Sequence, residues 1–194
     1  MARDKRLIIS LDVDDVLAEF MTSAMAALGS PSNPNGHSLT AMYPDREAEA
    51  RALVIDPAFH ARLSPVIGAV RGTVAMKFWY DAEIAYVSAR LPEMTDMTIA
   101  WLNRHNFPDG EIFCLGRGNG GKAECIRELG CAISIDDYPI TLDEIALMTD
   151  SVPVVFLSPW NIGYDAIEMS SWFHWKTAMD KAMAAADRLK MARV

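Results

Sequence analysis

The sequence has little of the features that would assign it at once to several broad classes of protein. It contains only three cysteines in 194 residues, Cys114, Cys125 and Cys131. Their odd number and wide spacing fit neither a disulfide framework nor a zinc site. The sequence also has no signal peptide and no apolar stretch long enough to cross a bilayer. We therefore expect a cytoplasmic protein with reduced cysteines in its core and no membrane partner.

Positive charge is also scarce, with 18 Lys and Arg residues against 26 Asp and Glu and a net charge of −8. This balance argues against binding to a nucleic acid polymer. A small phosphorylated substrate needs only one local cationic pocket, so it stays possible. The hydrophobic content of 51% is ordinary for a globular protein. The length allows one core and a small inserted subdomain.

The first apolar run ends in a cluster of carboxylates. Residues 7–11 predict a short buried strand, and Asp12, Asp14 and Asp15 follow it. Apolar residues at helical spacing then cover residues 16–28, so we expect the strand to pass straight into a helix. In open α/β sheets, ligands bind at this carboxyl end of the strands.

Asp12 and Asp14 are two residues apart and can therefore face one site. Two carboxylates this close repel each other and are costly to keep ionised. A divalent cation offsets that cost, because hard cations prefer oxygen ligands. The alternative is that Asp14 or Asp15 is only an N-cap of the next helix. We expect this of one of them, but it does not account for Asp12.

Strands and helices alternate along most of the remaining chain, which predicts an α/β fold with a doubly wound parallel sheet and helices on both faces. The predicted strands cover residues 83–87, 111–115, 132–135 and 153–157. The predicted helices cover residues 65–80, a segment that starts at Pro92, residues 121–129 and 141–148, and a C-terminal segment from Ser171.

Residues 30–64 interrupt this alternation. A loop rich in turn-forming residues is followed by predicted helical segments over 45–55 and 56–63. We interpret this block as a small helical cap inserted into an α/β core made of residues 1–29 and 65–194. The alternative is a long irregular connection, which is uncommon in compact domains.

The predicted C-terminal helix carries an apolar stripe at helical spacing, made of Trp172, Trp175, Met179, Met183 and Ala186. We interpret this stripe as core or dimer contact rather than as a cofactor-binding face. It permits a homodimer without indicating one.

Each predicted strand is followed by small or polar residues, and those after the first four strands are suited to phosphate chemistry. The second strand leads to Ser88, the third to a Gly-rich loop and Lys122, and the fourth to Asp136 and Asp137. A phosphate monoester needs positive charge and hydrogen-bond donors, which Lys122, Ser88 and the backbone amides after Asp12 can supply. Taken singly, Ser88 can also be a strand-end cap and Lys122 a solvated lysine.

In this order, Asp-x-Asp, Ser, Lys and an acidic pair resemble the motifs of the haloacid dehalogenase-like phosphohydrolases, which implies a Rossmann-like core. The string Asp-Val-Asp-Asp-Val-Leu-Ala-Glu-Phe, residues 12–20, resembles more closely the 5′(3′)-deoxyribonucleotidase branch. That branch usually has Asp-x-Asp-Gly-Val-Leu-Ala-Asp-Phe, so Asp15 and Glu19 are departures. Residues 59–70 and the Pro-Trp-Asn of residues 159–161 also resemble stretches of that family.

The resemblance implies a reaction and its catalytic residues. Asp12 would be the nucleophile that forms an aspartyl-phosphate. Asp14 would protonate the leaving alkoxide and then activate water. Mg²⁺ would be bound by Asp12, by the backbone carbonyl of Asp14 and by Asp136, with Asp137 supporting that metal site.

The resemblance also implies which residues bind phosphate. Ser88, Ala89 and Lys122 take the phosphate-binding positions, and Ala89 stands where a second hydroxyl can help. Arg90 follows closely and would approach the phosphate or the cap, with a solvated loop arginine as the alternative.

The predicted substrate-binding residues also include an aromatic group. Phe20 and Phe59 match residues that line the base pocket of the family, and His60 stands where a second aromatic residue is frequent. Simple core packing is the alternative for both phenylalanines. Tyr138 replaces a frequent arginine, which leaves base preference open.

We therefore predict a magnesium-dependent phosphoric monoester hydrolase that converts (deoxy)ribonucleoside monophosphates to nucleoside and phosphate. One alternative is a phosphatase of the same fold for a sugar phosphate or another small phosphate, and another is a nucleotide-binding regulator without turnover. Residues 116–122 also fit the P-loop pattern of a kinase-like protein. Ala123, however, stands where that pattern needs Ser or Thr, so we interpret the loop as presenting Lys122.

Overall fold

The structure, a computed structural model, describes residues 6–34, 36, 38–116, 118 and 121–191. Within these residues a six-stranded sheet has the order β3-β2-β1-β4-β5-β6, and every pairing is parallel. The strands are β1 (Ile8–Leu11), β2 (Glu83–Ser88), β3 (Glu111–Cys114), β4 (Ile133–Asp136), β5 (Val152–Phe156) and β6 (Ile167–Met169). The chain winds outward from β1 in both directions, so the predicted doubly wound parallel sheet is confirmed.

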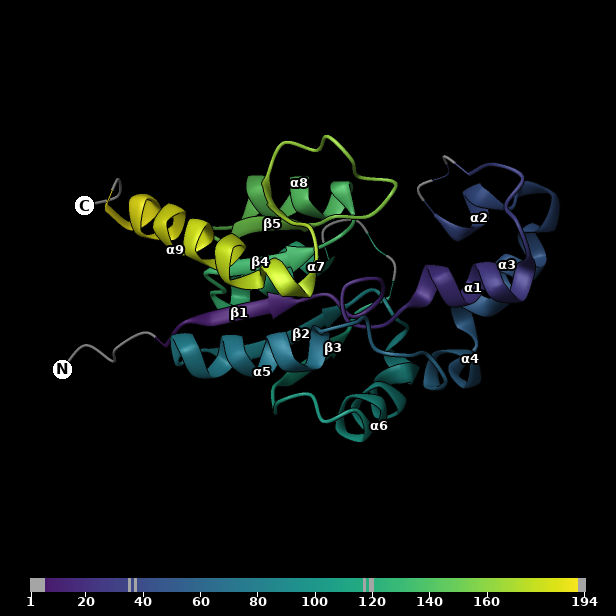
Figure 1. The fold of residues 1–194 in the computed structure, drawn as a ribbon, viewed down its shortest axis with the longest axis horizontal. Coiled ribbons are helices and arrows are strands. Elements are labelled where there is room, and N and C mark those ends of the chain that lie inside the picture. Colours follow the sequence, from purple (N-terminus) through teal and green to yellow (C-terminus); the bar gives the residue numbers. More distant parts are fainter. Residues whose placement is uncertain (1–5, 35, 37, 117, 119–120, 192–194) are drawn as a thin grey trace.

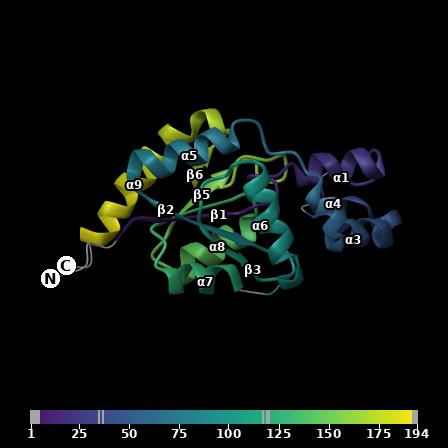
Figure 2. The same cartoon turned by 90° about the horizontal axis from the view of Figure 1, so that it is seen from below.

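Helices cover both faces of the sheet (Figure 2). On one face lie α5 (Ala69–Tyr80) and α9 (Trp175–Met191), and on the other lie α7 (Gly121–Leu129) and α8 (Pro139–Met148). The helix α6 (Thr95–Arg104) packs against β3. The strand β1 is largely apolar, as expected of a strand covered on both faces, and its one polar residue, Ser10, is buried and donates to Ser134 Oγ at 2.6 Å.

A second group of helices lies beyond the carboxyl ends of the strands, on the right of Figure 1. It consists of α1 (Phe20–Leu28), α2 (Leu39–Met42), α3 (Glu47–Ile55) and α4 (Pro57–Ala61). The helix α1 contacts α3, so it lies with residues 30–64 rather than on the sheet. The division of the chain into core and cap stays a prediction. We call these four helices the helical group.

The expected direct passage from the first strand into a helix is wrong. The helix α1 begins at Phe20, and residues 12–19 form a loop whose Val16 and Leu17 are fully buried. Asp15 has a φ of 60°, which a right-handed helix does not contain. The apolar spacing after Asp15 therefore reflects packing of a buried loop.

The C-terminal stripe is core, as one of its two interpretations predicted. Trp172, Met179 and Ala186 are buried, although α9 begins only at Trp175, after a short 3₁₀ turn at Trp172–His174. Two further 3₁₀ turns, Pro44–Arg46 and Pro92–Met94, precede α3 and α6.

The three cysteines are free, with Cys114 and Cys131 buried and Cys125 half-buried. Of the helices in the described ranges, none combines the length and apolar character needed to cross a membrane.

Candidate active site

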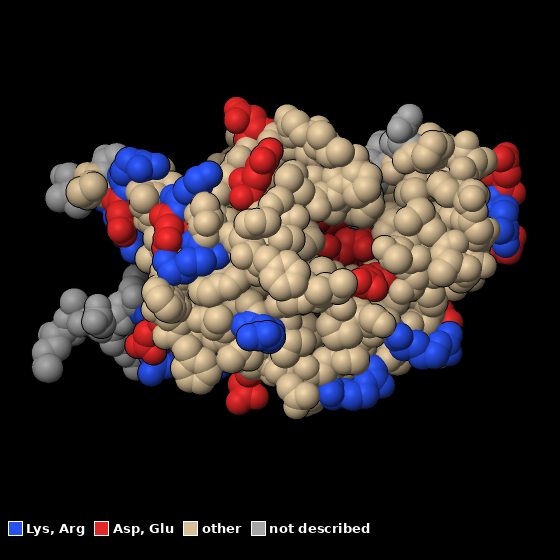
Figure 3. Space-filling view, viewed as in Figure 1, with Lys and Arg blue, Asp and Glu red and all other residues tan. Residues whose placement is uncertain are grey.

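A cavity of about 410 Å³ lies between the carboxyl edge of the sheet and the helical group. Figure 3 shows acidic residues at the bottom of this hollow. The sheet side supplies polar residues, among them Asp12, Asp137 and Lys122. The helical group supplies an opposite, mostly apolar wall, made of Phe20, Met21, Leu39, Val54 and His60.

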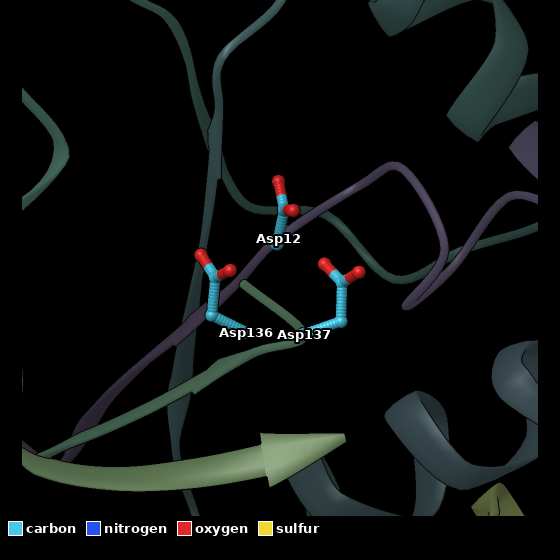
Figure 4. Close-up of side chains that lie close together, drawn as sticks. All are labelled: Asp12, Asp136 and Asp137. Atoms are coloured by element: carbon cyan, nitrogen blue, oxygen red, sulfur yellow. The ribbon is translucent and has the colours of Figure 1, made fainter. Parts of the chain in front are cut away.

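Three carboxylates meet at the edge of the sheet, from Asp12, Asp136 and Asp137 (Figure 4). One oxygen atom of each lies within 4.8 Å of the others, and all three residues are buried. Leu11 pairs with Ile135 in the parallel register of β1 and β4, and the Asp12 amide donates to the Ile135 carbonyl at 2.9 Å. This register places the residues that follow the two strands side by side, as the sequence pattern predicts.

Lys122 lies in the first turn of α7 and joins two of these carboxylates. Its Nζ is 2.8 Å from Asp12 Oδ1 and 2.9 Å from Asp136 Oδ2. Burial alone would lower the pKa of Lys122, but the two carboxylates raise it above its usual range. Burial raises the pKa of Asp12 to about 7, although the Lys122 charge acts in the opposite direction. Lys122 is therefore a buried cation and not a solvated lysine.

Asp137 is held by a motif whose role the sequence alone did not assign. The Trp160 indole donates to Asp137 Oδ2 at 2.9 Å, and the Asn161 amide donates to the Asp137 carbonyl at 2.7 Å. Burial, followed by the nearby charges of Asp15 and Asp136, raises the pKa of Asp137 well above its usual range. The Pro-Trp-Asn sequence after the fifth predicted strand was the available signal for this contact.

The donor set of this cluster fits Mg²⁺. It offers three buried carboxylates, two of which contact Lys122, and Mg²⁺ selects hard oxygen ligands of this kind. The Asp14 side chain does not join the cluster, because it pairs with a different cation. Any contribution of Asp14 to the metal is therefore limited to the backbone carbonyl that the family resemblance implies.

Asp14 forms a two-point ion pair with Arg90. The Arg90 Nε donates to Oδ2 at 3.1 Å and Nη2 donates to Oδ1 at 2.7 Å. Arg90 is buried, and its Nη1 also donates to Thr98 Oγ1 at 3.1 Å. Burial alone would raise the pKa of Asp14, but the charge of Arg90 holds it below the usual range. Arg90 is thus not a solvated loop residue, and its contact is with the predicted acid–base carboxylate.

Asp15 takes the capping role that we expected of Asp14 or Asp15. Its Oδ1 accepts a hydrogen bond from the Met21 amide at 2.8 Å, in the first turn of α1. Burial raises the pKa of Asp15 well above its usual range. Aspartate tolerates the positive φ at this position better than most residues other than glycine, which fits the replacement of the glycine that is usual in the resembled family.

The predicted phosphate-binding residues lie around the same edge. Ser88 ends β2 and is buried, and its Oγ accepts a hydrogen bond from the Arg90 amide at 3.2 Å. Ala89 and Lys122 line the cavity. Within the Gly-rich loop, Arg117, Asn119 and Gly120 lie outside the described residues, so the P-loop pattern is not tested there.

The predicted aromatic group forms a cluster on the wall opposite the carboxylates. The ring centroids of Phe20 are 5.8 Å from Phe59 and 5.2 Å from His60. Phe20 and His60 line the cavity, and Phe59 packs against both rings. Binding of substrate by these rings stays a prediction.

No protein-family profile and no curated protein sequence matches this chain, but its fold matches solved structures along nearly its full length. A haloacid dehalogenase-like family hydrolase from Xanthomonas campestris aligns with a TM-score of 0.60 and 13% identity, over 94% of this chain and 98% of that one. CbbY from Rhodobacter sphaeroides, in complex with phosphate, aligns with a TM-score of 0.57 and 13% identity, over 89% of this chain and 98% of that one.

A third structure is a HAD family hydrolase from Deinococcus radiodurans with bound phosphate and sodium. It aligns with a TM-score of 0.55 and 12% identity, over 91% of this chain and 96% of that one. At these identities the likeness shows the fold. The chain therefore has the fold of the haloacid dehalogenase-like hydrolases, and these matches do not address the deoxyribonucleotidase branch.

Proposed function

We propose that this protein is a magnesium-dependent phosphomonoesterase whose favoured substrates are (deoxy)ribonucleoside monophosphates. The observation that carries the proposal is the buried cluster of Asp12, Asp136 and Asp137 with Lys122 at the carboxyl edge of the sheet. Two of the solved structures with this fold hold phosphate, which supports phosphate as the reacting group.

In the proposed reaction, an Asp12 oxygen attacks phosphorus and the bond from phosphorus to the ester oxygen breaks. The products of this step are an aspartyl-phosphate and the alcohol. Asp14 gives a proton to the leaving oxygen and later takes one from the water that hydrolyses the intermediate. Arg90 holds the Asp14 carboxylate at two points and favours its ionised form. This form takes the proton from water in the second step, and the same ion pair opposes the protonated form that the first step needs.

The carboxylates of Asp12 and Asp136 and the Asp14 carbonyl would hold Mg²⁺, with Asp137 supporting them. When bound, the ion supplies positive charge that offsets the repulsion between the attacking carboxylate and the phosphate. Lys122 contributes a second cation beside the Asp12 carboxylate, with its Nζ 2.8 Å from Oδ1.

The shape and lining of the cavity support a nucleoside as the alcohol part. A volume of about 410 Å³ lies within the usual range of sites for small molecules. The apolar wall of the helical group offers aromatic and aliphatic surface to a base, and the sheet side offers the charges that a phosphate needs.

The proposal is tested by phosphate release from a panel of nucleoside monophosphates and sugar phosphates. The assay uses added Mg²⁺, chelator in place of Mg²⁺, and the variant Asp12→Asn. We expect release from nucleotides that falls at least about 1,000-fold in the variant, because the nucleophile is lost, and that stops in chelator. Asp187→Asn, the same change at an exposed position on α9, is the matched control and keeps activity.

Release from sugar phosphates alone would keep the hydrolysis and remove the nucleotide assignment. No release from any member of the panel would overturn the proposed function.

A further inference from the structure

His60 carries a buried ring nitrogen without a hydrogen-bond partner. Among the side chains of the described residues, only His60 Nδ1 and His105 Nε2 are buried nitrogen or oxygen atoms of this kind. His60 lines the cavity, whereas His105 packs on Trp101 in α6. Leaving a buried polar atom unpaired is unfavourable, so we expect His60 Nδ1 to form a hydrogen bond when a ligand fills the cavity.

The contact made by the other ring nitrogen indicates what Nδ1 can bind. His60 Nε2 lies 3.0 Å from the Val54 carbonyl oxygen, which only accepts hydrogen bonds, so Nε2 carries a proton. In the neutral ring, Nδ1 is then the acceptor. The orientation of the ring is set by its neighbours, because Phe20 stacks on it and Phe59 meets it edge-on.

The acceptor faces the predicted acid–base carboxylate. His60 Nδ1 lies 3.7 Å from Asp14 Oδ1, which is longer than a hydrogen bond. Asp14 already receives two hydrogen bonds from Arg90. With the ring neutral, two acceptors therefore face each other between α4 and the loop after β1. A hydroxyl there can donate its single proton to Nδ1, while Asp14 keeps its two hydrogen bonds from Arg90.

We infer that His60 selects substrates whose alcohol part carries a hydroxyl group beside the phosphoester carbon, by accepting a hydrogen bond from that hydroxyl at Nδ1. This inference rests on the proposed function, since Asp14 marks the position of the ester oxygen. A hydroxyl on the neighbouring carbon lies next to that oxygen. Because Nδ1 is buried, the His60 and Asp14 side chains have to move apart for the hydroxyl to enter.

The inference divides nucleotides by the position of the phosphate. A ribonucleoside 2′- or 3′-monophosphate has a free hydroxyl on the neighbouring carbon. In a 5′-monophosphate, the neighbouring carbon carries the ring oxygen, which has no proton to donate. His60 thus favours ribonucleoside 2′- and 3′-monophosphates over the 5′ isomers and over 2′-deoxynucleoside 3′-monophosphates.

The test compares substrates that differ by one hydroxyl. The first pair is uridine 3′-monophosphate and 2′-deoxyuridine 3′-monophosphate, and the second is 2-hydroxyethyl phosphate and ethyl phosphate. In each pair we expect kcat/KM to be about tenfold higher for the member with the hydroxyl, the usual effect of one net hydrogen bond. The second pair keeps the test independent of the nucleoside.

Three variants assign the preference to Nδ1. His60→Phe keeps an aromatic ring against Phe20 but has no acceptor. In this variant the ratio of kcat/KM between the two members of a pair should fall to about one. His60→Asn places an amide oxygen near the position of Nδ1 and should retain most of the preference. His105→Phe is the same change at the other bare histidine, and it should keep the ratio of the unmodified protein.

The outcomes separate this inference from the proposed function. Phosphate release at equal kcat/KM from both members of a pair, or an unchanged ratio in His60→Phe, would overturn the role of His60 and leave the phosphomonoesterase standing. No release from any of the four compounds, with release from nucleoside 5′-monophosphates in the panel, would overturn the role of His60 and leave the phosphomonoesterase standing. No release from these compounds or from any member of the panel would overturn both.

Discussion

At the scale of single residues, the site is a set of buried charges that compensate one another unequally. Lys122 faces two carboxylates, while Arg90 is matched to Asp14 alone. A buried charge without a full partner shifts its own protonation rather than staying ionised. The pKa of Asp12 is raised and that of Asp14 is lowered. The two carboxylates of one Asp-x-Asp motif therefore change the stability of the fold in opposite directions as pH rises.

In the metal-free protein, we expect Asp12 to make stability fall as pH rises from about 4 to about 7. Burial raises the pKa of Asp12 to about 7, whereas in the unfolded chain it is about 3.9. Between these values the folded state keeps a proton that the unfolded state has lost, so a rise in pH favours unfolding. Asp12→Asn has no such proton. Its Tm minus that of the unmodified protein should therefore increase across this window in calorimetry with chelator present.

Asp187→Asn, at an exposed position, is the control for this measurement. Asp14 acts in the opposite direction, since its lowered pKa adds stability that is lost as pH falls, but it is present in both proteins and cancels in the difference. A Tm difference for Asp12→Asn that stays constant from pH 4 to pH 7 would contradict the expected titration.

At the scale of secondary-structure elements, the loop of residues 12–19 combines an unusual backbone with chemistry, since Asp12, Asp14 and Asp15 all lie in it. Its Asp15 has a φ of 60°, so residues without glycine-like freedom are strained there. We expect Asp15→Gly to be more stable than Asp15→Ala by about 1 kcal/mol, because both lose the hydrogen bond to Met21 and only alanine keeps the strain. Chemical denaturation at one pH measures the difference.

Glu19 provides the comparison, since it lies at the other end of the same loop with a φ of −73°. There the order should reverse, with Glu19→Ala more stable than Glu19→Gly. Equal stability of the two Asp15 variants would mean that the loop relaxes to another backbone conformation.

The same loop shows why the sequence predicts some elements and not others. The strands β1 to β5 follow from apolar runs, whose burial on both faces leaves a direct trace in the sequence. The start of α1 does not, because Val16 and Leu17 are buried by loop packing that imitates helical spacing. The strand β6 has only three residues, too few for any period to show.

The residues of the candidate site also divide into those that the sequence predicts and those that it does not. Asp12, Lys122, Asp136 and Asp137 are predictable together, because carboxyl ends of parallel strands and the adjacent helix starts meet at one edge. The Asp14–Arg90 pair and the Trp160–Asp137 bond depend on the directions of side chains from loops. The bare nitrogen of His60 depends on how the helical group sits over the sheet. Apart from the Pro-Trp-Asn sequence, no local pattern in the sequence indicates those contacts.

Packing between elements gives a second prediction at this scale, at Gly72 of α5. A Cβ atom there would lie 2.4 Å from Cε3 of Trp172, and that ring is held by a hydrogen bond from its Nε1 to the Val16 carbonyl at 2.7 Å. Gly72→Ala should lower the free energy of unfolding by about 1–3 kcal/mol, even though alanine is the better helix former. Urea denaturation measures it.

Arg71→Ala, at the exposed neighbour in the same helix, should change the free energy of unfolding by no more than about 0.5 kcal/mol. If Gly72→Ala matched or exceeded the stability of the unmodified protein, helix propensity would outweigh the contact with Trp172.

At the scale of the whole molecule, two chain segments connect the helical group to the sheet, and these segments are hydrogen-bonded to each other. The Glu19 amide donates to the Ser64 carbonyl at 2.9 Å, and the Val66 amide donates to the Leu17 carbonyl at 2.8 Å. Ala18 also forms an isolated antiparallel bridge with Pro65. The outgoing and returning segments thus form one short two-stranded connection. The helices beyond this connection differ in how much apolar surface they bury.

We expect the amides of α3 to exchange with solvent faster than those of β1 and β4. Ala50 is the buried residue of α3, whereas β4 is buried along its whole length. An element that buries little apolar surface opens locally at a low free-energy cost. Hydrogen exchange followed by mass spectrometry measures this, and α9, with Ala178, Met179, Ala182 and Ala186 buried, is the helical control that should exchange slowly.

Exchange of α3 as slow as that of β1 would mean that the helical group and the sheet open only together. The expected order has a consequence for the site, because His60 and Phe20 come from the helical group and the carboxylates come from the sheet. If the helical group opens first, the apolar wall can leave the cavity while the register of β1 and β4 still holds Asp12 beside Asp136. Substrate could then enter without any loss of the charged half of the site.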